Sequence, residues 1–92
     1  AKPEWWNDEG LKALSARVVT AAPNAKFPAA HSMRATVLIG QCAAWEAGPR
    51  SAAELNEAAT HYERAAVLTN APAVKAHKAD LAAWCRAHAE SL

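Results

Sequence analysis

The hydrophobic positions of the chain recur at helical spacing in four segments, and proline or glycine separates one segment from the next. In the first segment Leu11, Leu14 and Val18 follow intervals of three and four residues, which place them on one face of a helix. The segments that this pattern predicts as helices are approximately 8–22, 28–45, 51–69 and 72–91. We therefore expect an all-α fold in a single domain that spans residues 1–92.

The residues at the predicted helix starts support these boundaries. Asn7 or Asp8 can cap the first helix, and Pro28 and Pro72 suit a first helical turn, where no backbone N–H is needed. The sequence from Ser51 to Glu54 fits a capping box, in which each residue satisfies a backbone N–H of the other. Because the connecting segments are short, we expect consecutive helices to be antiparallel neighbours.

Composition and charge narrow the class of protein. The 26 alanines among 92 residues favour helices that pack closely, since alanine is both small and the best helix former. The net charge is only +1 and no block of like charge exists, which argues against a nucleic-acid partner. The apolar runs are too short for a transmembrane segment. We expect Trp45 and Trp84, each at the end of an apolar stripe, to lie in the core.

Two segments of the chain are similar to each other. Residues 16–23 align with residues 65–72, and five of the eight positions are identical, including the proline that ends each segment. Such a match indicates a duplicated helix-turn-helix unit, although the high alanine content also raises the number of chance matches.

The second of these segments resembles a known repeat. Ala58, Tyr62, Ala65 and Pro72 match the small residue, aromatic residue, alanine and final proline in the second helix of a tetratricopeptide repeat (TPR). The resemblance implies four antiparallel helices arranged as two TPR-like helix-turn-helix units, and a scaffold function without catalysis. The spacing of 46 to 49 residues between the units exceeds the roughly 34 residues of the family, with residues 40–50 resembling an insertion.

The candidate catalytic and metal-binding residues are few. Glu57 and His61 are four residues apart, which is typical of a surface pair on a helix. No phosphate-binding loop or nucleophile motif accompanies them, so we expect no enzymatic activity and no cofactor. Cys85 and His88 are three residues apart and could share a metal ion with Cys42, although no Cys-x-x-Cys motif supports such a site. The alternative function is therefore a small cofactor- or metal-binding helical bundle. Its candidate ligands are His31, His77, Cys42, Cys85 and His88.

Adjacent tryptophans before the first helix are the strongest candidates for binding a protein partner. Trp5 and Trp6 cannot face the same direction, so one can pack on the domain while the other contacts a partner, or both can cover the end of the helices. We expect a partner to be bound by Trp5, Trp6, Tyr62 and Arg64. The sequence thus predicts a non-catalytic protein–protein interaction module, or a small structural subunit of a larger assembly.

The first residue suggests one specific setting for such a subunit. The sequence starts at Ala1 rather than methionine, as expected if a targeting peptide has been removed or if the sequence is an excerpt. An intracellular accessory subunit, peripheral to an organellar membrane complex such as a photosynthetic one, would fit this start.

Overall fold

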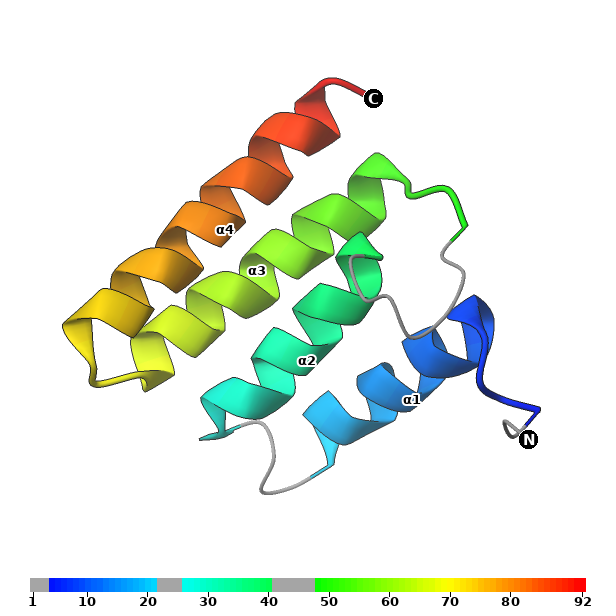
Figure 1. The fold of residues 1–92 in the computed structure, drawn as a ribbon, viewed down its shortest axis with the longest axis horizontal. Coiled ribbons are helices and arrows are strands. Elements are labelled where there is room, and N and C mark those ends of the chain that lie inside the picture. The colour runs from blue at the N-terminus through cyan, green and yellow to red at the C-terminus, as the bar shows by residue number, and fades with distance from the viewer. Residues whose placement is uncertain (1–3, 22–25, 41–47) are drawn as a thin grey trace.

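The computed structural model describes residues 4–21, 26–40 and 48–92. Its helices are α1 (Asp8–Thr20), α2 (Pro28–Ile39), α3 (Ala52–Leu68) and α4 (Pro72–Glu90). The described ranges contain no β-strand. Figure 1 shows that each helix runs antiparallel to the one before it. The predicted all-α fold of four helices is therefore confirmed, whereas the resemblance to a tetratricopeptide repeat stays a prediction.

The helices form an open array rather than a closed bundle. The main contacts join α1 to α2, α2 to α3 and α3 to α4. Figure 1 accordingly shows α1 at one edge of the array and α4 at the opposite edge. The domain measures 39 × 34 × 20 Å along its principal axes. Its two edge helices each keep a face that is turned away from the rest of the array.

The expected capping residues fix the starts of α1 and α3. The Asn7 side chain accepts a hydrogen bond from the backbone N–H of Gly10 at 2.8 Å. Ser51 Oγ accepts from the Glu54 backbone N–H at 3.1 Å, and the Ser51 backbone N–H donates to Glu54 Oε1 at 3.0 Å. The predicted capping box is therefore present, and it anchors the helix that lies in the middle of the array.

The predicted second helix, 28–45, is too long. Helix α2 ends at Ile39, because Gly40 adopts a left-handed conformation with φ 70°. Glycine accepts this conformation without the steric cost that a side chain would bring, and it commonly ends helices in this way. The expected core position of Trp45 lies outside the described residues.

Small side chains allow the three later helices to approach closely. A cluster of buried residues joins α2, α3 and α4: Ala35, Leu38, Ala58, Ala59, Tyr62, Ala82 and Cys85. Ala58 and Ala59 are completely buried between neighbouring helices. The alanines thus serve as contact positions, as their number in the sequence indicated.

The expectation that Trp84 lies in the core is wrong. Its side chain is 44% exposed and stacks on the imidazole of His88, with ring centroids 5.2 Å apart. The buried side of α4 is formed by Ala82, Cys85 and Ala89, and position 84 lies away from that line on the helix. The helical periodicity placed Trp84 close to the apolar stripe but did not show that α4 is packed on one side only.

Candidate functional site

A tight turn before α1 holds the two adjacent tryptophans. The Asn7 backbone N–H donates to the Trp5 carbonyl at 2.8 Å, and Asn7 Nδ2 donates to the Glu4 carbonyl at 2.8 Å. The turn passes so close to α1 that a Cβ atom at Gly10 would clash with the Trp5 carbonyl oxygen. Glycine at position 10, inside a helix, is therefore what allows Trp5 and Trp6 to lie against α1.

These tryptophans form one wall of an apolar groove between α1 and α2. The indole rings of Trp5 and Trp6 are 5.6 Å apart and tilted by 56°. The groove has a volume of about 560 Å³. The described residues that line this Trp5–Trp6 groove are Trp5, Trp6, Leu11, Leu14, Ala29, Ser32, Met33, Thr36 and Val37. Apart from the indoles, the only polar groups among these side chains are the hydroxyls of Ser32 and Thr36, so the groove is suited to binding apolar groups.

Large apolar side chains in this groove are exposed to solvent. Trp5 is 48% exposed and Met33 is 37% exposed, although both are large hydrophobic residues. Tryptophan and methionine are enriched at protein interfaces, since they offer a large apolar contact area. The predicted binding residues Trp5 and Trp6 therefore lie together, on a face that also presents Met33 from α2.

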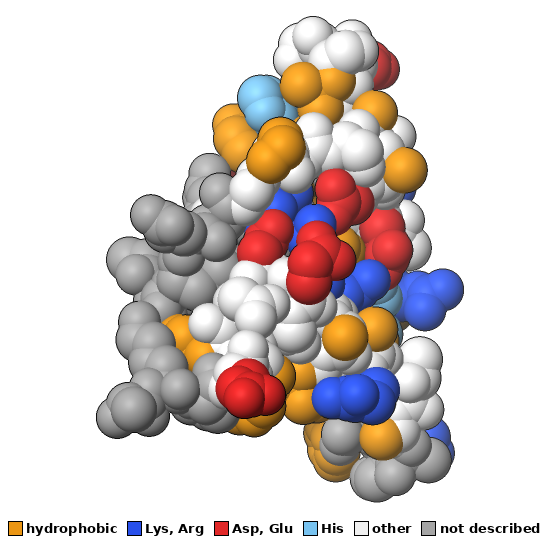
Figure 2. Space-filling view, turned by 90° about the vertical axis from the view of Figure 1, so that its right-hand side faces the viewer, with side chains coloured by type: hydrophobic (Ala, Val, Ile, Leu, Met, Phe, Trp, Pro, Cys, Tyr) orange, Lys and Arg blue, Asp and Glu red, His pale blue; other side chains and the backbone are white. Residues whose placement is uncertain are grey.

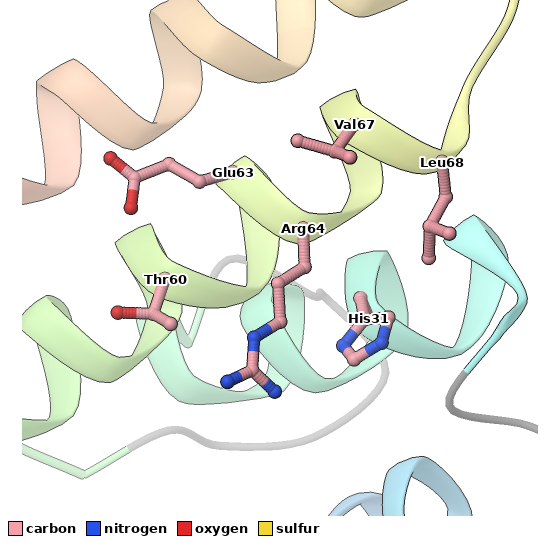
Figure 3. Close-up of a pocket in the computed structure, with 6 residues that line it drawn as sticks. All are labelled: His31, Thr60, Glu63, Arg64, Val67 and Leu68. Atoms are coloured by element: carbon pink, nitrogen blue, oxygen red, sulfur yellow. The ribbon is translucent and has the colours of Figure 1, made fainter.

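A second pocket lies between α2 and α3 and contains the predicted residue Arg64. Its volume is about 370 Å³, and its lining includes His31 and Val67. Figure 3 shows Arg64 and His31 on the same side of α3, whereas Glu63 points toward α4. Glu63 accepts a 2.6 Å hydrogen bond from Arg86 of α4. Arg64 is exposed and separate from the Trp5–Trp6 groove.

The expectation that Tyr62 contacts a partner does not fit its position. Tyr62 is only 3% exposed, and its hydroxyl lies 3.3 Å from Thr36 Oγ1 in a hydrogen bond that links α3 to α2. Burial raises the pKa of Tyr62 above its ordinary value. Tyr62 therefore belongs to the core.

A series of hydrogen-bonded polar side chains lies beside the second pocket. Histidine and glutamate are residue types that can act in catalysis, but the geometry of this series favours a structural role. The Nδ1 atoms of His31 and His61 lie 3.0 Å apart, and His61 Nε2 lies 3.2 Å from Glu57 Oε2. Burial lowers the pKa of His61, and the hydrogen bond to Glu57 offsets this only in part. A neutral His61 that donates to Glu57 through Nε2 accepts a hydrogen bond from His31 through Nδ1. The hydrogen bond between the two histidines thereby joins α2 to α3.

Arg34 connects this pair to α1. It donates to Glu57 at 3.0 Å, to the Lys12 carbonyl at 2.7 Å and to Ser15 Oγ at 3.1 Å. Burial acts to raise the pKa of Glu57, but the hydrogen bond and charge of Arg34 outweigh it and lower the pKa. The side chains of three helices are therefore held by one polar network.

A second set of ion pairs connects the starts of α1 and α3. Arg50 donates to both carboxylate oxygens of Asp8, at 2.6 and 2.7 Å, and Lys12 Nζ lies 2.5 Å from Glu54. Figure 2 shows acidic side chains with basic ones among them at the middle of one face. Opposite charges are thus paired with each other rather than presented as a patch of one sign. No pattern in the sequence pointed to these pairs, because their members are 42 residues apart in the chain.

The described residues of the alternative metal site, Cys85 and His88 among them, do not converge on one point. Cys85 is completely buried, and burial raises the pKa of its thiol. His88 is exposed and stacks on Trp84, and Cys42 lies outside the described residues. Within residues 4–21, 26–40 and 48–92, no group of three or more His, Cys, Asp or Glu side chains could hold a metal ion.

Comparisons with family models, curated proteins and solved structures found no match to this chain. None of the helices in the described part combines the length and hydropathy that crossing a membrane requires.

Proposed function

We propose that this chain is a non-catalytic protein-interaction module whose binding surface is the Trp5–Trp6 groove. The observation that carries the proposal is an apolar groove with two tryptophans at its wall, in a domain that otherwise pairs many of its charged side chains. A small structural subunit of a larger assembly would use such a surface to hold its neighbour.

The shape and chemistry of the groove define the partner. The groove runs between two helices and offers mainly apolar side chains, so it suits the apolar face of a helix from another protein. Trp5 and Met33 supply the exposed contact area, and the Ser32 hydroxyl can form a hydrogen bond at the side. No acid, base or thiol is among the described lining residues, which favours binding over catalysis.

Site-specific photo-crosslinking tests this proposal. A photoreactive phenylalanine analogue replaces Met33 inside the groove, or Val67 as the control, which is 76% exposed on α3 outside the groove. We expect the Met33 probe to capture a defined protein from an extract of the source cells, and the Val67 probe to capture none of it. Equal capture at both positions, or capture at neither, would contradict the proposal.

A further inference from the structure

Each of the two edge helices of the array presents an outer face on which no other described helix packs. Helix α1 packs mainly on α2 and helix α4 mainly on α3, and Figure 1 shows them at opposite edges. A face at the edge of a helical array can accept one more helix, provided that shape and charge match.

The outer face of α4 is apolar apart from one acidic residue at its middle. Its exposed members follow helical spacing on the side opposite Ala82, Cys85 and Ala89: Ala73, Ala76, Asp80, Trp84 and Ala87. The alanines let another helix approach closely, and Trp84 provides a large apolar contact. Asp80 has no ion-pair partner among the residues that the structure describes.

The outer face of α1 has the opposite charge at the corresponding place. Its exposed members lie opposite the buried residues Leu11, Ser15 and Val19: Glu9, Ala13, Arg17 and Thr20. Arg17 also lacks an ion-pair partner within the described ranges. Each of these two outer faces thus carries one charge for which the described residues provide no counter-charge.

We propose that a second copy of this chain docks head to tail, with its α1 on the outer face of α4. The new pair of helices is antiparallel, because α1 and α4 run in opposite directions within one copy (Figure 1). It therefore continues the alternation already present in the array.

A single register satisfies both the charges and the sizes of the side chains. When Arg17 of the second copy is placed opposite Asp80, antiparallel helices with equal rise per residue bring the other positions into line. The pairs of outer-face residues that this register places opposite each other are Arg17 with Asp80 and Ala13 with Trp84. Trp84 then covers a small residue, and the two opposite charges meet.

The charges also disfavour the two-fold arrangements that are centred on Asp80 or on Arg17. A symmetric pair of α4 helices centred on Asp80 would place two carboxylates together, and a symmetric pair of α1 helices centred on Arg17 would place two guanidinium groups together. Head-to-tail docking pairs Asp80 with Arg17 at every contact, so it can repeat from copy to copy.

Charge-reversal variants test the proposal by sedimentation velocity over a wide range of protein concentration. We expect wild-type protein to increase in mass with concentration. Arg17→Asp and Asp80→Arg should each weaken this association by roughly tenfold or more, since an exposed ion pair is replaced by repulsion. An equal mixture of the two variants should associate again, because the arginine introduced on α4 of one variant then meets the aspartate introduced on α1 of the other. Lys75→Asp, an exposed position of α4 outside its outer face, is the matched control and should associate like wild type.

Several outcomes would overturn the proposal: a wild-type protein that stays monomeric throughout, single variants that associate like wild type, or a mixture that stays as weak as its components. Circular dichroism checks that each variant is folded. If a charge-reversal variant does not fold, the neutral variants Arg17→Gln and Asp80→Asn take its place. A Trp6→Ala variant should keep the self-association, which separates this proposal from partner binding in the Trp5–Trp6 groove.

Discussion

The capping box at the start of α3 allows a quantitative test of how the fold is held together. In Ser51→Ala the Glu54 backbone N–H loses the hydroxyl that accepts its hydrogen bond at 3.1 Å. The reciprocal bond from the Ser51 backbone N–H to the Glu54 carboxylate remains available, as does the ion pair between Glu54 and Lys12. Because these two interactions persist, we expect a loss of about 1 kcal/mol in the free energy of unfolding.

The position of α3 makes this local loss visible in the stability of the whole domain. Helix α3 contacts both α2 and α4, so its unfolding exposes most of the core cluster. A loss of about 1 kcal/mol corresponds to a decrease of roughly 4–8 °C in Tm for a domain of this size. Urea denaturation, followed by circular dichroism at the helical band, measures the free energy directly.

Two matched variants distinguish capping from a general effect of substitution. Ser51→Gly should cost only a few tenths of a kcal/mol (about 0.3), because glycine is also accepted at this helix position. Ser91→Ala removes a hydroxyl that donates to the His88 carbonyl at the exposed end of α4. The reasoning is refuted if Ser51→Ala is no more destabilising than Ser91→Ala, or if glycine costs as much as alanine at position 51.

Two further predictions concern the core and its histidines. Leu38→Ala should lower the free energy of unfolding by about 2–5 kcal/mol because Leu38 is 2% exposed, whereas Trp84→Ala, at 44% exposed, should cost less than about 1 kcal/mol by urea denaturation. The pKa of His61 is lower in the folded state than its ordinary value of 6.5, so its contribution to stability is complete above that value and is lost as the pH falls below it. The stability of the wild type should therefore decrease between about pH 7 and pH 5. The decrease should be smaller in His61→Gln and unchanged in His77→Gln, a variant at an exposed position. Identical pH profiles for all three proteins would contradict the lowered pKa of His61.

The local signals in the sequence predicted the helices well. The starts of α3 and α4 follow from Ser51 with Glu54 and from Pro72, because capping and proline geometry depend on residues close in the chain. The end of α2 was missed, since a glycine at position 40 fits both a helix interior and a left-handed helix end. Only the path of the backbone after Ile39 decides between them.

The candidate site was predictable only in part. Trp5 and Trp6 were recognisable as adjacent indoles outside a helix, but the groove also needs Met33 from α2, which no local pattern connects to them. The burial of Tyr62 depends on which face of α3 its two neighbouring helices cover. The exposure of Trp84 follows from the position of α4 as the last described helix of the array. Ion pairs between helices, such as those that join α1, α2 and α3, depend on contacts between segments distant in the chain. No spacing in the sequence therefore predicts them.

The affinity of the crosslinked partner for two tryptophan variants tests the proposed function most directly. Trp6→Ala removes a wall of the Trp5–Trp6 groove, and Trp84→Ala removes an exposed tryptophan elsewhere on the domain. With both variants shown to be folded, we expect Trp6→Ala to weaken binding by roughly thirtyfold or more, the effect of losing a central interface residue worth about 2 kcal/mol. Trp84→Ala should bind like wild type. Equal affinities for Trp6→Ala and wild type would contradict the assignment of this groove as the partner-binding surface.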